Sequence, residues 1–291
     1  MASSPASDAK PAFASDWTAY APLDARWSEQ LRAALGDLRE AIRRHRSWTY
    51  LAVRAVKNQY RRTVLGPWWL TLQTAVYVVG LGLIFGQLLG SGLREFVPYV
   101  AVGFITFTLL AGLTRAGANV FTTSSSVLKS TRQPLVSLVL RDVTVELIQF
   151  GHNLLIVALF FAFGLITPSV WLALAPFALL AILVNGVAVA LWLGPLVARF
   201  RDVGPAVDSV LQVLIFFTPV FYKASDLRGA QSALVGWNPF TYFVELFRSA
   251  MLGHHPSTQN IVGAGAFTVA NLVIAVLVFA RGRSRLPYWV A

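Results

Sequence analysis

Apolar stretches dominate the chain from residue 65 onward, and polar or turn-forming residues separate each stretch from the next. A helix needs about 20 predominantly apolar residues to cross a hydrocarbon core about 30 Å thick. The expected fold class is therefore an all-α integral membrane protein. The pattern predicts six transmembrane helices, at 65–89, 97–114, 143–166, 170–197, 206–222 and 261–280.

The residues before the first span differ from the rest. Residues 1–22 are rich in Ala, Ser and Pro. They lack the basic start and apolar run of a secretory signal peptide, so we expect a disordered cytoplasmic tail. From 24 to 46, apolar residues recur at spacings of three and four, which predicts a helix that lies on a partner. These apolar positions are Trp27, Leu31, Leu35, Leu38 and Ile42.

Residues 47–62 form a basic amphipathic pattern that ends at the first span. Arg54, Lys57 and Arg61 fall on one helical face, and apolar residues such as Trp48 and Val56 cover the other. Such a helix is expected to lie in the membrane interface and to offer its polar face to the cytoplasm. We therefore divide the chain into an N-terminal tail and helix (1–46), an interface helix (47–64), a six-span domain (65–282) and a C-terminal tail (283–291).

The segment 223–260 is aromatic and apolar, but Pro239 breaks it and it contains Glu245 and Arg248. It is too short and too charged to span the membrane. We interpret it as one or two short re-entrant helices that dip into the outer leaflet, where protein or water covers them. The alternative is an amphipathic hairpin that rests on the periplasmic surface.

The charges agree with a membrane protein. Charged residues make up 13% of the chain, against about 25% in soluble domains. The net charge of +11 does not point to nucleic acid, because the basic residues cluster beside the spans. With both termini in the cytoplasm, 16 of the 20 Lys and Arg from position 43 onward lie on the cytoplasmic side, which fixes the orientation. The chain has no cysteine, which excludes disulfides and thiolate metal sites.

Four short motifs occur in a characteristic order: NQYRRTVLGPWW at 58–69, ARFRDV at 198–203 leading to FFTPVFY at 216–222, WNPFTYFVELFR at 237–248, and RLPYWV at 285–290. Their order and spacing resemble the ABC-2 type polysaccharide-export permeases. The resemblance covers the chain from about residue 47 to its end.

The resemblance implies an exporter of lipid-linked polysaccharide in the inner membrane. O antigen, part of lipopolysaccharide, is the expected substrate, and capsule and teichoic acid are the alternatives. It also implies a homodimer in which each permease binds one ATPase subunit that holds ATP and Mg. The chain contains no G-x-x-x-x-G-K-[ST] loop, so we expect it to need no cofactor and to leave ATP hydrolysis to that partner.

Aromatic rings can stack on sugar rings without demanding one register, which suits a sliding polymer. The candidate translocation path consists of Trp68, Trp69, Tyr77 and Phe85 in the first span and Phe216, Phe217, Phe221 and Tyr222 in the fifth. The alternative is that these rings only anchor and pack the helices.

Two polar elements beside the cytoplasmic span ends are candidates for coupling to the ATPase. A partner that moves must contact a rigid part of the permease to transmit its movement. The two elements are the interface helix and the 122–134 loop, and the basic residues concerned are Arg54, Lys57, Arg61, Lys129 and Arg132. The segment between the fifth and sixth spans is the candidate outer gate, with Trp237, Asn238, Pro239, Glu245 and Arg248.

Ionisable groups inside spans are unfavourable and usually paired. Arg115 and Glu146 are expected at similar depth, which predicts a structural ion pair. Asp142 and Asp208 are expected near Arg141 and Arg201. His152 is interpreted as a hydrogen-bonded packing residue, and the pair His254–His255 lacks the further ligands of a metal site.

Two other functions remain as alternatives. An integral-membrane enzyme acting on lipid-linked sugars needs clustered carboxylates or a metal site, whereas the 13 acidic residues are scattered. An ion-coupled carrier often contains internal repeats, and we find none between the two halves of the chain.

Overall fold

The computed structural model describes residues 26–66, 68–88, 92–130, 133–224 and 227–290, and every regular element within them is helical. The all-α class is therefore confirmed. Four helices are long and apolar enough to cross a membrane: α4 (Leu93–Thr123), α6 (Leu135–Ala162), α7 (Ala175–Arg199, preceded by the 3-10 turn η2, Val170–Leu174) and α11 (Thr258–Gly282). Two shorter apolar helices, α3 (Trp68–Leu88) and α8 (Val203–Phe217), correspond to the first and fifth predicted spans.

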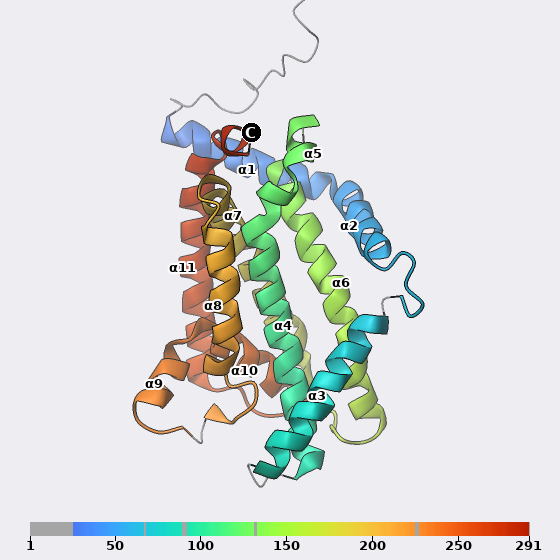
Figure 1. Cartoon of the computed structure of the whole chain (residues 1–291). Coiled ribbons are helices and arrows are strands. Elements are labelled where there is room, and N and C mark those ends of the chain that lie inside the picture. Colours follow the sequence, from blue (N-terminus) through green and yellow to red (C-terminus); the bar gives the residue numbers. More distant parts are fainter. Residues whose placement is uncertain (1–25, 67, 89–91, 131–132, 225–226, 291) are drawn as a thin grey trace, which may run out of the picture.

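Helix α4 lies at the centre of the bundle (Figure 1). The protein buries 72% of its most apolar stretch, against 17% to 33% for the other three long helices. Small residues allow this packing: a Cβ added at Gly117 would lie 2.9 Å from the Cα of Ala190 on α7. Close approach at small residues is the usual way in which membrane helices associate.

Several helix ends differ from the prediction. Helix α4 begins at Leu93, so Arg94 and Glu95 belong to its first turn and not to a loop. It also continues nine residues beyond the predicted end at position 114, to Thr123. The predicted 122–134 loop contains the short helix α5 (Ser125–Ser130). Helix α6 begins at Leu135, eight residues before the predicted start of the third span.

The fifth span was predicted to reach residue 222, but α8 ends at Phe217. The next residue, Thr218, is extended, with ψ of 134°. It precedes Pro219, whose ring disfavours the helical conformation in the residue before it. Phe221 and Tyr222 therefore follow the helix and do not belong to it.

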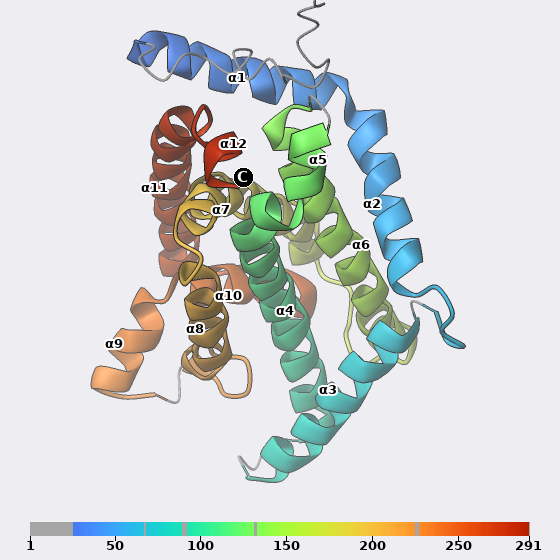
Figure 2. The ribbon, with the colours of Figure 1, turned by 45° about the horizontal axis from the view of Figure 1, so that its top comes forward.

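The N-terminal part forms two helices, α1 (Trp27–Arg43) and α2 (His45–Gln59). Figure 2 shows α1 crossing the ends of α11 and α6, while α2 runs alongside α6. The face of α1 that packs against the bundle is formed by Ala34, Asp37 and Ala41. The predicted apolar stripe lies beside that face, and Leu35 and Ile42 within it are more than half exposed.

The segment between the fifth and sixth spans contains α9 (Ala230–Trp237) and α10 (Pro239–Leu252). One or two short helices were predicted here, and the structure has two. That they dip into the outer leaflet stays a prediction. Helix α10 packs against α4, α7 and α11. The helix ends at Leu252, and the next residue, Gly253, adopts the left-handed conformation (φ 78°) that favours glycine after a helix. A last turn, α12 (Leu286–Trp289), follows α11 and packs against α7.

Candidate functional site

Helices α3 and α8 flank α4 (Figures 1 and 2). A polar stripe on α4 faces these two helices. Thr108, Arg115, Asn119 and Thr122 are spaced seven, four and three residues apart, so they share one face of the helix. Thr108 and Arg115 are exposed, and the other two are half-buried. The threonines and the asparagine were not among the predicted site residues, because isolated polar residues within a span do not indicate which neighbour they face.

Aromatic rings from α3, α4 and the segment after α8 form a row. Tyr77 stacks on Phe104 with ring centres 5.7 Å apart, and Phe104 lies 6.5 Å from Phe221. Phe104, which was not among the predicted path residues, joins the rings predicted from the first and fifth spans. Phe221 is only 8% exposed and belongs to the core, so its ring does not lie on an open surface.

Five of the eight predicted path residues expose much of their surface: Trp68 (60%), Trp69 (55%), Tyr77 (52%), Phe216 (69%) and Phe217 (44%). Tyr222 forms one hydrogen bond through its side chain and one through its backbone. Its hydroxyl donates to the Phe216 carbonyl at 3.1 Å, and its carbonyl accepts from the Tyr99 hydroxyl at 3.0 Å. The side chain of Phe85 lies outside the described residues.

The Arg115 guanidinium forms an ion pair with Asp208 at 2.7 Å, which links α4 to α8. Asp208 thus takes the place of the predicted partner, Glu146. Of the ion pairs between described residues, none joins Asp208 to Arg201. Among the described residues no ion pair joins Arg115 to Glu146. The Glu146 carboxylate instead lies against Gly112, where a Cβ would overlap it. The two acids approach α4 from different helices, and Arg115 extends toward α8.

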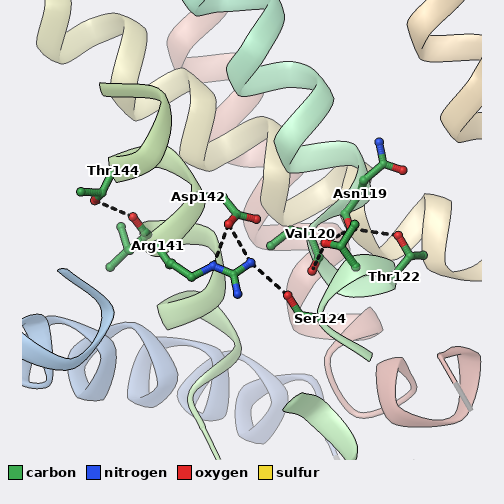
Figure 3. Close-up of polar contacts among 9 residues, drawn as sticks. Asn119, Val120, Thr122, Ser124, Arg141, Asp142 and Thr144 are labelled. Carbon is green, nitrogen blue, oxygen red and sulfur yellow. Dashed lines mark hydrogen bonds and ion pairs between the residues drawn. The ribbon is translucent and has the colours of Figure 1, made fainter. Parts of the chain in front are cut away.

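A second charged pair lies on α6, and a hydrogen bond from its arginine reaches the end of α4 (Figure 3). The Arg141 guanidinium lies 2.7 Å from Asp142 and also donates to the Ser124 hydroxyl at 3.1 Å. The predicted proximity of Asp142 to Arg141 is therefore confirmed. His152 also behaves as predicted, because its Nδ1 lies 2.8 Å from the carbonyl of Ile148.

Arg248, a predicted gate residue, is 2% exposed and joins three elements. It pairs with Glu245 at 2.6 Å, donates to the Pro219 carbonyl at 2.7 Å, and lies 3.8 Å from the ring centre of Tyr99. Gly103 leaves the space that its guanidinium occupies. These contacts tie α10 to α4 and to the segment after α8, beside a cavity of about 570 Å³.

The other predicted gate residues lie where α9 meets α10. The side chain of Asn238 accepts from the backbone N–H of Phe240 at 3.0 Å, which caps α10, and donates to the Thr218 hydroxyl at 2.9 Å. Pro239 is the first residue of α10, a position where a missing N–H is harmless. Trp237 is 84% exposed.

Of the predicted coupling residues, Arg54 and Lys57 are exposed on α2. On the same helix Ala52 and Val56 are buried, where α2 packs against α6. Arg61 is also exposed but lies beyond the end of α2 at Gln59, so it does not share the helical face as predicted. Arg132 and the side chain of Lys129 lie outside the described residues.

The pKa of the Tyr60 hydroxyl, at the end of α2, is raised by burial and by the nearby Glu146 carboxylate. The end of α2 lies beside this part of α6, because the Gln149 side-chain amide donates to the side-chain carbonyl of Gln59 at 3.3 Å. In the described part of the chain, no three His, Asp or Glu side chains are close enough to hold a metal ion.

The helices and their apolar surfaces define a multi-pass membrane protein. Residues 46–252 match the family model described as ABC-2 type transporter, and the chain belongs to this family. The membrane domain of this family is the transmembrane permease subunit and not the ATPase, and such permeases work with ATP-binding subunits. Helices α1 and α11 lie outside the matched residues.

The chain is also similar to a protein of Myxococcus xanthus named O-antigen export system permease protein RfbA. The two are 24% identical over 237 residues, which cover 80% of this chain and 91% of the relative.

Proposed function

We propose that this chain is the membrane subunit of an ATP-driven exporter that moves a lipid-linked polysaccharide, with O antigen as the favoured substrate, out of the cytoplasm. The complex contains two copies of the chain and two ATPase subunits in the inner membrane. The observation that carries the proposal is the polar stripe of α4, which Thr108 and Arg115 expose between the aromatic residues of α3 and α8.

Polar and charged groups that face lipid are unfavourable, and in membrane proteins they usually face a partner helix or water. A second copy placed against α3 and α8 would enclose the stripe of α4 in a shared, hydrated path. Exposed rings such as Tyr77 and Phe216 would flank this path. Rings can stack on sugars while hydroxyl and amide groups exchange hydrogen bonds with them, so a polymer could slide through with weak, repeated contacts.

The distribution of charge supports an orientation with both termini in the cytoplasm. Arg281 and Arg283 lie near α1 at the end of the bundle where α6 begins. Arg94, at the start of α4, lies at the opposite end. Positive residues favour the cytoplasmic side, so the end with α1 faces the cytoplasm in this proposal. The exposed Arg54 and Lys57 of α2 would then be accessible to the ATPase.

Deletion of the gene in its own host tests the proposal. Full-length polysaccharide should disappear from the cell surface and accumulate inside the cell, still attached to its lipid carrier. Surface immunolabelling and gel analysis of whole-cell polysaccharide distinguish the two locations. The control is the strain that carries the intact gene. Normal surface polysaccharide in the deletion strain would contradict the proposal.

A further inference from the structure

A small polar cavity of about 160 Å³ lies between α3, α4 and α6. Each of the three helices contributes polar groups to its lining, although all three are apolar helices. Thr108 of α4 is the central residue of that helix, so the cavity lies at the middle of the most buried candidate span. The polar lining residues are Gln73 and Thr74 from α3, Thr108 from α4, and Glu146, Gln149 and Asn153 from α6.

The Glu146 carboxylate is unusual among these groups. Within the described residues it accepts no hydrogen bond and forms no ion pair, whereas the Thr74 hydroxyl contacts Asn153 at 3.1 Å. Gly112 of α4 leaves the space for the carboxylate. A carboxylate surrounded by apolar helices is unfavourable unless water or a ligand donates hydrogen bonds to it.

The neighbouring charges do not neutralise Glu146. Arg115 lies one turn beyond Gly112 on α4 and pairs with Asp208. Asp142 lies one turn before Glu146 on α6 and pairs with Arg141. No Lys, Arg or His is among the described residues that line the cavity. A phosphate or a sugar carboxylate would therefore find no opposite charge in the lining.

We infer that this cavity is a subsite for one sugar ring of the exported polymer, and that it accepts neutral and amino sugars and disfavours acidic ones. The inference rests on the proposed function. The volume is well below the roughly 300 Å³ of sites for drug-sized ligands, so it suits one ring of a longer chain. Carboxylate, amide and hydroxyl groups match sugar hydroxyls, and the Tyr77 and Phe104 rings border the cavity as stacking surfaces.

Saturation-transfer NMR with the purified full chain in lipid nanodiscs tests this inference directly. The probes are maltohexaose, which is neutral, and hexagalacturonate, which has the same length and carries carboxylates. Maltohexaose should receive saturation. Hexagalacturonate, added as a competitor of maltohexaose, should bind with an affinity at least about fivefold lower. That factor corresponds to one repulsive pair of unit charges about 4 Å apart in water.

Two substitutions connect the preference to Glu146. Glu146→Lys should reverse the order of the two affinities, so that hexagalacturonate binds more tightly than maltohexaose. Glu146→Gln should still bind maltohexaose, but the difference in affinity between the two probes should be smaller. The matched control is Glu40→Lys, because Glu40 is exposed on α1 and lies away from the cavity. Thermal unfolding of each variant checks that it is folded. If Glu146→Lys does not fold, the result with Glu146→Gln alone tests the inference.

The inference is overturned if neither oligosaccharide receives saturation or if both bind the wild type equally. It is also overturned if the folded Glu146→Lys variant keeps the wild-type order, or if the folded Glu146→Gln variant keeps the full wild-type difference between the two probes. These results leave the proposed function intact when deletion of the gene still abolishes export. Loss of the proposed function would instead appear as normal surface polysaccharide in the deletion strain.

Discussion

The carboxylate of Asp37 lies 3.2 Å from the guanidinium of Arg283, although 246 positions separate the two residues. The second carboxylate oxygen of Asp37 accepts the backbone N–H of Val136 at 2.9 Å, in the first turn of α6. The two side chains are 4% and 14% exposed. Helix α1 therefore fixes the ends of α6 and α11 relative to one another.

Removal of this connection should destabilise the protein. Asp37→Ala removes the ion pair with the buried Arg283 and the acceptor for the backbone N–H of Val136, so the free energy of unfolding should fall by about 3 kcal/mol. Denaturant or thermal unfolding in detergent measures the change. The control is Glu40→Ala, whose ion pair with Arg44 is about half exposed and should contribute less than about 1 kcal/mol. Equal, small effects of both substitutions would contradict this role of Asp37.

The ion pair between Arg115 and Asp208 makes a different prediction. Both side chains are roughly half exposed, at 50% and 41%, so either single charge reversal should change stability by less than about 1 kcal/mol. Each reversal should nevertheless reduce export, because it places two like charges between α4 and α8. The exchanged pair, Arg115→Asp with Asp208→Arg, should recover export, as measured by surface polysaccharide. An exchanged variant as defective as either single one would show that the pairing itself is not required.

The basic residues of the interface helix should contact the ATPase. Charge reversal at Arg54, Lys57 and Arg61 together should abolish co-purification of the ATPase, because all three side chains are exposed and would be accessible to it in the proposed orientation. The control reverses three exposed arginines of α1, which should leave the complex intact: Arg32, Arg39 and Arg43. If the variant with reversed charges at Arg54, Lys57 and Arg61 still co-purifies with the ATPase and exports polysaccharide, α2 serves only as a membrane anchor.

Much of the fold follows from patterns that are local in the sequence. Long apolar stretches predict the spanning helices, and Pro239 marks the start of α10. The end of α8 could also have been placed, since Thr218 precedes Pro219. The extension of α4 to Thr123 could not have been predicted, because polar residues end the apolar stretch. The helix continues there because Phe121 packs against Gly194.

The contacts within the site depend on tertiary arrangement, which the sequence does not specify. Depth alone made Glu146 a reasonable partner for Arg115, but the position of α8 brings Asp208 into contact. In α1 the apolar periodicity singled out residues such as Leu35, whereas the face with Asp37 is buried. An amphipathic pattern identifies a helix and its faces, but it does not say which face the rest of the protein covers.

The aromatic residues of α3 and α8 should matter together for export. Tyr77→Ala with Phe216→Ala removes one exposed ring from each side of α4 and should strongly reduce surface polysaccharide while membrane insertion and ATPase binding persist. The matched control is Phe163→Ala with Phe177→Ala, which removes two rings of similar exposure elsewhere on the surface. Equal loss of export in two folded variants would mean that the rings act only as lipid contacts.

Reconstitution of transport tests the central claim most directly. The purified chain and its ATPase are placed in inverted membrane vesicles with radiolabelled lipid-linked polysaccharide on the outer, cytoplasmic side. The account predicts that label enters the lumen only when both subunits and hydrolysable ATP are present, and that the chain alone hydrolyses no ATP. Entry of label without the ATPase, or ATP hydrolysis by the isolated chain, would contradict it.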